Sequence, residues 1–101
     1  MSEKIIVKID PDLEDLIPGF LNNRANDVST IRSLLDSGDL DQSRILGHSM
    51  KGAGGGYGFD RITEIGGIIE TACVAGDLPV ISEAVDQLAD YLARVEPVPE
   101  A

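Results

Sequence analysis

The segment from Gly47 to Gly58 contains the residue types most able to carry chemistry in this chain. It holds the only histidine, His48, and a lysine, Lys51, three residues later. A helix turns by about 100° per residue, so these two side chains would share one face. Imidazole, with an unperturbed pKa of about 6.5, is a nucleophile that can accept an activated phosphoryl group near neutral pH. An ammonium group one turn away can neutralise part of the added charge. The pair favours phosphoryl transfer, with nothing beside it to hydrolyse the product.

Four further residues on the same face predict a surface for a partner protein. Gly52 and Gly55 follow His48 at helical spacing, and without side chains there another backbone can approach the imidazole closely. Arg44 and Ile45 precede it by one turn. Ile45 is either a partly buried rim residue or an apolar docking contact, and we expect Arg44 to pair with a nearby acid or with the partner. The opposite face is apolar and predicts a core: Leu46, Met50, Ala53 and Tyr57.

These residues resemble a known family. His48-x-x-Lys51-Gly52, a glycine-rich run ending at Gly58, and Gly38-Asp39 opening the helix are similar to the histidine-containing phosphotransfer (Hpt) domains of bacterial phosphorelays. The resemblance extends from about residue 10 to about residue 95. It implies an all-α, antiparallel four-helix bundle in which His48 is phosphorylated and Lys51 stabilises the phosphate. It also implies that Gly52 and Gly55 form the bare surface for a receiver domain. The family pattern does not require glycine at positions 54 and 56, where this chain has Gly54 and Gly56.

Hydrophobic periodicity and capping residues predict where the helices begin and end. Asp10-Pro11 marks a helix start, and Pro18-Gly19 predicts either a kinked first helix or a break into a short N-terminal helix and a longer one. We expect Asp39 or Asp41 to cap the helix that carries His48, and Asp60 to cap the next. The long helices are expected to end at residues 37, 75 and 95, with Gly38, Gly76 and Pro97 just beyond those ends.

The end of the His48 helix is predicted differently by two arguments. Each glycine in a helix interior costs about 0.5–1 kcal/mol relative to alanine. Propensity therefore predicts a break near Gly54. The family resemblance instead implies that the helix continues to about Tyr57, with packing from Met50, Ala53 and Tyr57 in compensation.

Length and composition predict one domain covering residues 1–101. We expect an extended N-terminal arm at 1–9, a helical bundle at 10–95 and a frayed tail at 96–101, where Pro97 and Pro99 end the last helix. The β-branched run of the arm is expected to pack along the bundle, with a dimer contact as the less favoured alternative.

Charge and cysteine content limit the partners and the compartment. Eight basic and eighteen acidic residues give a formal charge of −10, which disfavours nucleic acid and anionic membrane. No apolar run approaches the length of a membrane span, and the N-terminus does not lead into a signal-peptide pattern. Cys73, the single cysteine, lies on an apolar stripe and cannot form an internal disulfide, consistent with a reducing compartment. We expect a cytoplasmic monomer with Cys73 in its core.

Other chemistries fit the sequence poorly. The order Lys51-Gly52, with no hydroxyl after it, does not match a Walker loop. One histidine and one cysteine, 25 positions apart, do not make a metal site. Ser49 is about 100° around the helix from His48, so a hydrolase triad fails. We expect no cofactor and no metal in this chain, with Mg²⁺ only in the partner's receiver domain.

The sequence thus predicts a phosphocarrier that shuttles a phosphoryl group between receiver-domain aspartates through phosphohistidine at His48. It has no kinase or ATPase parts of its own. The expected partners are a response-regulator receiver domain, a hybrid histidine kinase, or both. Two alternatives stay open: a helical adaptor that docks a receiver without chemistry, and a phosphorylation module cut from a longer chemotaxis-type kinase.

Overall fold

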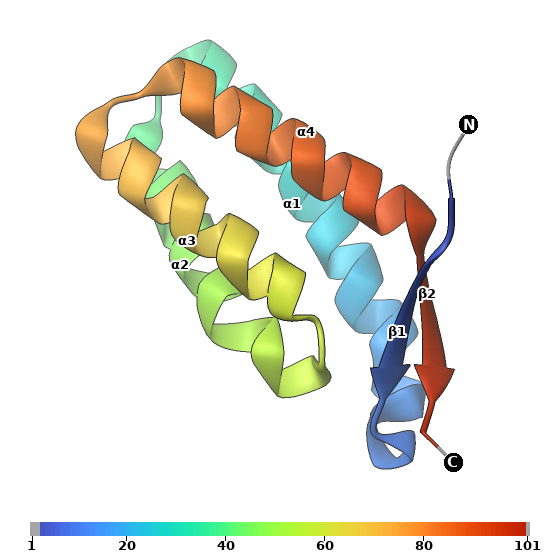
Figure 1. Cartoon of the computed structure of the whole chain (residues 1–101). Coiled ribbons are helices and arrows are strands. Elements are labelled where there is room, and N and C mark those ends of the chain that lie inside the picture. The colour runs from blue at the N-terminus through green and yellow to red at the C-terminus, as the bar shows by residue number, and fades with distance from the viewer. Residues whose placement is uncertain (1–2, 101) are drawn as a thin grey trace.

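The structure, a computed structural model, describes residues 3–100 and shows within them an antiparallel four-helix bundle with a two-stranded sheet beside it (Figure 1). The predicted all-α bundle is confirmed. The long helices are α1 (Ile17–Ser37), α2 (Leu40–Ala53), α3 (Asp60–Ala75) and α4 (Leu78–Arg94). Short 3₁₀ turns, η1 (Pro11–Leu16) and η2 (Gly55–Tyr57), precede α1 and follow α2, and the strands are β1 (Ile5–Ile9) and β2 (Val95–Pro99).

Gly-Asp pairs link α1 to α2 and α3 to α4. Gly38 and Gly76 end α1 and α3 in the left-handed conformation, with φ of 79° and 69°. The carboxylates of Asp39 and Asp77 then accept hydrogen bonds from the backbone N–H three residues further on, at 3.0 and 3.3 Å. Because glycine adopts positive φ without steric cost and aspartate caps the next N-terminus, each link stays short and reverses the chain.

The first helical segment is broken rather than kinked. Asp10 caps η1 by accepting a hydrogen bond from the N–H of Asp12 at 2.9 Å, and Pro11 opens that turn. Pro18 lies in the first turn of α1, where its missing N–H breaks no helical hydrogen bond. The predicted short N-terminal helix therefore exists, as a 3₁₀ turn. The predicted cap Asp60 is instead the first residue of α3, and its side chain makes no capping hydrogen bond.

A single apolar core lies between the four helices, and Cys73 is buried in it. Aromatic rings join the glycine-rich end of α2 to α1. The Phe20 ring stacks on Tyr57 and Phe59, with centroids 4.3 and 5.7 Å apart. Stacked aromatic pairs contribute about 0.5–1.5 kcal/mol beyond area burial, so these contacts hold a segment that its glycines alone would leave loose.

The prediction of a frayed tail at 96–101 is wrong for the residues described, up to 100. β2 pairs in parallel with β1, from Ile5 with Val95 to Ile9 with Pro99. Glu100 continues the ladder by donating its N–H to the Ile9 carbonyl at 2.9 Å. Since N–H groups along a strand alternate in direction, Pro97 and Pro99 fall where an N–H would point away from β1. The prolines end α4 without preventing pairing, and the extended arm is half of a small sheet.

Candidate functional site

Glycines allow α2 and α3 to approach each other at backbone distance. A Cβ on Gly66 would lie 2.5 Å from the backbone nitrogen of Lys51 and 2.7 Å from the Gly47 carbonyl oxygen. A Cβ on Gly47 would lie 2.9 Å from the nitrogen of Glu70. These separations are shorter than real Cβ contacts, so any side chain would force the helices apart. The close approach brings side chains on the outer faces of the two helices within hydrogen-bonding reach.

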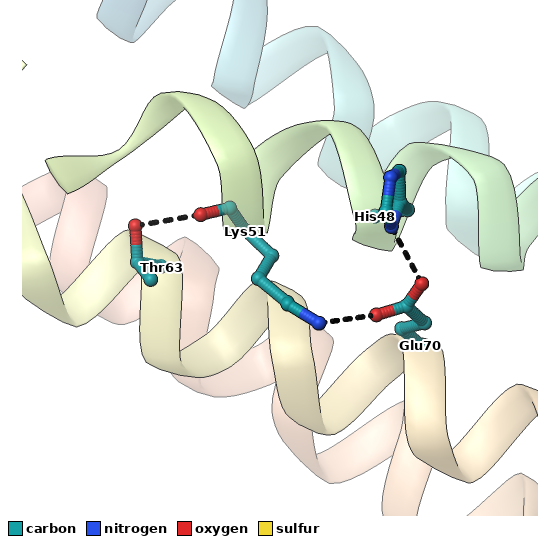
Figure 2. Close-up of polar contacts among 4 residues, drawn as sticks. All are labelled: His48, Lys51, Thr63 and Glu70. Atoms are coloured by element: carbon teal, nitrogen blue, oxygen red, sulfur yellow. Dashed lines mark hydrogen bonds and ion pairs between the residues drawn. The ribbon is translucent and has the colours of Figure 1, made fainter. Parts of the chain in front are cut away.

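A carboxylate on α3 bridges the two residues predicted to carry the chemistry (Figure 2). Glu70 Oε2 lies 2.7 Å from His48 Nδ1, and Glu70 Oε1 accepts a hydrogen bond from Lys51 Nζ at 3.0 Å. The imidazole remains accessible, with 69% of its side-chain surface exposed, whereas Glu70 keeps 21%. The ammonium and the imidazole are therefore held next to one another by a single acceptor.

The bridge determines which ring nitrogen of His48 carries the proton. An ionised carboxylate only accepts hydrogen bonds, so His48 Nδ1 carries the proton in this contact. In the neutral imidazole the lone pair is then on Nε2, the nitrogen on the far side of the ring from Glu70. The hydrogen bond from Lys51, and next the one from His48, lower the pKa of the Glu70 carboxyl below its usual value. Glu70 is consequently an anion at neutral pH and holds the tautomer with Nδ1–H.

A threonine on α3 fastens the end of α2. The Thr63 hydroxyl donates a hydrogen bond to the Lys51 carbonyl at 3.0 Å (Figure 2). The same hydroxyl accepts one from the Gly55 N–H at 2.8 Å. A Cβ on Gly54 would lie 2.6 Å from the Thr63 nitrogen, so this glycine, which the family pattern did not require, is needed for the contact. The α-helix ends at Ala53, as propensity predicts, and a 3₁₀ turn continues to Tyr57.

The predicted docking residues lie around His48 in different degrees of exposure. Ile45 is 47% exposed, and a Cβ on Gly52 would meet nothing within 4 Å. A Cβ on Gly55 would touch side chains of α3 at 3.6 Å, so the space there is narrower. Arg44 is half-buried and has no ion-pair partner among residues 3–100, so the nearby acid expected for it is not found. Its charge lies near Cys73, where it only partly offsets the rise in thiol pKa caused by burial.

Sequence reasoning missed four residues that shape the site: Gly47, Thr63, Gly66 and Glu70. Glu70 lies 22 residues from His48 and is one of eighteen acidic residues, so its pairing follows only from the packing of α2 on α3. A partial signal for that packing was present. Gly66 lies between Ile65 and Ile69 on the buried face of α3, and small residues at such positions favour close helix contact.

In residues 3–100, no group of three or more histidine, cysteine or acidic side chains is placed to hold a metal ion. Over the same residues, none of the helices combines the length and the apolar character needed to cross a bilayer.

A comparison with protein-family models identifies the chain. The Hpt domain model matches residues 15–97, which is most of the sequence, and the protein belongs to the Hpt domain family. Neither the curated proteins nor the solved structures gave a match. Hpt domains interact with receiver domains and histidine kinases in phosphorelays, so membership supports a phosphotransfer-related role for this chain.

Proposed function

We propose that this chain is a phosphocarrier whose His48 Nε2 accepts a phosphoryl group from a receiver-domain aspartyl phosphate and passes it to another receiver. The observation that carries the proposal is the contact of Nδ1 with Glu70 at 2.7 Å on an imidazole that is otherwise open to solvent. It leaves the lone pair of the neutral ring on Nε2. We place the reaction in the cytoplasm and treat the chain as a monomer.

The phosphoryl group can move to His48 without the imidazole losing a proton. The Nε2 lone pair attacks phosphorus, a bond forms between nitrogen and phosphorus, and the bond from phosphorus to the aspartate oxygen breaks, with its electrons left on the carboxylate. The ring then bears phosphorus on Nε2 and hydrogen on Nδ1, and is positively charged. Glu70 stabilises that charge through the hydrogen bond it already makes. The reverse path delivers the group to a second aspartate.

Lys51 supplies positive charge beside the phosphoryl group. Its ammonium is 3.0 Å from Glu70 and its side chain is 51% exposed, so it can turn toward a phosphate without leaving a buried partner. The aliphatic part of Lys51 lies against α3, with Cδ 3.6 Å from where a Cβ on Gly67 would be. This support limits the conformational freedom of the side chain, so we assign Lys51 to neutralising charge on the phosphorylated imidazole.

The remaining parts of the reaction are assigned to the partner. We propose that Mg²⁺ binds in the acidic pocket of the receiver and that the chain does not use ATP. Incubation with ATP and Mg²⁺ alone should then leave the chain unlabelled, whereas addition of a phosphorylated receiver should give an acid-labile label.

The decisive variant is His48→Gln, which retains polarity and removes the nucleophile. It should take no label from a receiver domain loaded with acetyl phosphate, while the wild-type chain is labelled under the same conditions. Circular dichroism should show an unchanged helix content, because the side chain is exposed. Full labelling of His48→Gln would refute the proposal. A receiver that binds the wild-type chain without transferring phosphate would identify an adaptor instead.

A further inference from the structure

One face of α3 holds Lys51 from its backbone to its ammonium group. Thr63 donates a hydrogen bond to the Lys51 carbonyl, and the Lys51 ammonium donates one to Glu70, both at 3.0 Å (Figure 2). Between these ends, a Cβ on Gly66 would lie 2.5 Å from the Lys51 nitrogen, and a Cβ on Gly67 would lie 3.6 Å from its Cδ. The four residues of α3 are spaced i, i+3, i+4 and i+7, which places them on one side of a helix. The position of Lys51 is therefore set by α3 as well as by its own helix.

The Thr63 hydroxyl lies where α2 loses a helical hydrogen bond. In a continuing α-helix the Gly55 N–H would donate to the carbonyl four residues earlier, which belongs to Lys51. Instead, the Gly55 N–H donates to Thr63 Oγ1 at 2.8 Å, and the same hydroxyl donates to the Lys51 carbonyl. A side chain inserted in this way interrupts the helical ladder. Both backbone groups stay hydrogen-bonded although α2 ends at Ala53.

The inserted hydroxyl has little freedom to move. A Cβ on Gly54 would lie 2.6 Å from the Thr63 nitrogen and 2.8 Å from Thr63 Oγ1, so the end of α2 and the start of α3 are in close contact there. Without the hydroxyl, the Gly55 N–H and the Lys51 carbonyl would have to bond to each other or lose their partner. Either change alters the backbone of the turn that begins at Lys51.

We infer that Thr63 is a positioning residue for phosphotransfer and acts through Lys51. Its hydroxyl holds the backbone from which the lysine side chain extends, and this keeps the ammonium within reach of the group on His48. The attraction between an ammonium and a phosphoryl group depends on their separation, so a displaced lysine stabilises the product less. The inference rests on the proposed function, in which Lys51 neutralises charge on the phosphorylated imidazole, and names the residue that sets the position of that lysine.

The test removes the hydroxyl and keeps the shape of the side chain. Phosphoramidate, a small donor that labels His48 without a receiver, is the probe. We expect the second-order rate constant of labelling to fall about fivefold in Thr63→Val and to stay within about twofold of wild type in Thr63→Ser, which retains the hydroxyl. Thr30→Val is the matched control, because it removes a hydroxyl that donates to the Asn26 carbonyl in α1 at 3.0 Å. It should label at the wild-type rate.

A double-mutant cycle with Lys51→Ala separates positioning of the lysine from general support of the fold. If Thr63 acts through the lysine side chain, adding Thr63→Val to Lys51→Ala should change the rate constant less than about twofold. The same fivefold loss in both backgrounds, or no loss in Thr63→Val alone, would overturn the inference and leave the proposed function standing. Should Thr63→Val prove poorly folded by circular dichroism, Thr63→Ala also removes the hydroxyl and takes its place in the cycle.

Failure of the proposed function gives a different pattern. If phosphoramidate labels the wild-type chain and no receiver does, the proposed function fails, and the cycle with phosphoramidate still decides the role of Thr63. If neither donor labels His48, the chain has no reaction for Thr63 to assist, and the inference is overturned together with the proposed function.

Discussion

Glycines on the two sides of α2 have opposite surroundings. On the side facing α3, a Cβ on Gly47 or Gly54 would lie 2.6–2.9 Å from neighbouring atoms, and the helices are nearly in backbone contact. On the outer side, a Cβ on Gly52 would meet nothing within 4 Å. The inner glycines set the distance from α3 and thereby the bridge through Glu70, whereas the outer glycine leaves room for a partner. Residue type alone does not distinguish the two roles, because the difference lies in what surrounds each glycine.

Gly66→Ala should break the inner contact most severely. The added methyl would lie 2.5 Å from the backbone nitrogen of Lys51, and a backbone atom can move away only if the helices separate. We expect a loss of about 3 kcal/mol in the free energy of unfolding, measured with urea. The matched control is Gly19→Ala in α1, where nothing lies within 4 Å and the better helix propensity should add up to about 1 kcal/mol. Equal stability of Gly66→Ala and wild type would contradict the close contact described here.

Gly47→Ala should perturb the site with a smaller cost in stability. Its Cβ would lie 2.9 Å from both the Glu70 nitrogen and the Ile69 Cγ2, and the side chain can partly yield. We expect a loss of about 1–2 kcal/mol. We also expect a weaker bridge, seen in ¹⁵N spectra as a smaller fraction of His48 in the form with Nδ1–H. A destabilised variant with an unchanged tautomer would show that the contact supports the fold without positioning Glu70.

Gly52→Ala should leave the fold intact and affect only the outer side. The methyl enters open space, so stability should stay the same or rise by up to about 1 kcal/mol through helix propensity. Under the proposed function, phosphotransfer from a receiver should slow, because the methyl would occupy open space that the receiver needs to approach His48, while labelling by phosphoramidate, a small donor, stays at the wild-type rate. A slow reaction with both donors would instead place Gly52 among residues that support the imidazole.

Glu70→Gln should change stability only slightly, in a way that depends on pH. The pKa of Glu70 is lowered in the folded chain, so ionisation of this carboxyl favours the folded state above its ordinary pKa of about 4.3. That contribution is lost as the pH falls through the lower, folded-state pKa. Urea unfolding between pH 3 and 7 should therefore show a shallower pH dependence in Glu70→Gln than in wild type. Identical profiles would mean that the bridge contributes nothing to stability.

Local signals explain what the sequence could predict. The helix ends at Gly38 and Gly76, the caps at Asp39 and Asp77, and the shared face of His48 and Lys51 all depend on residues within one or two turns. Glu70 and Thr63 reach α2 from 12 to 22 positions away, and their roles depend on how α3 is rotated against it. The β1–β2 pairing joins the two ends of the described chain. Pro97 and Pro99 suggested a frayed tail, but they lie where an N–H would point away from β1, so its absence removes no hydrogen bond of the ladder.

The central claim is that Glu70 holds the proton on His48 Nδ1 and leaves Nε2 as the phosphorylated atom. Its most direct test is NMR of the ¹⁵N-labelled chain after phosphorylation by a receiver domain. We expect a ³¹P–¹⁵N coupling at Nε2 of His48, while Nδ1 keeps its proton. A coupling at Nδ1, or phosphate on any residue other than His48, would contradict it.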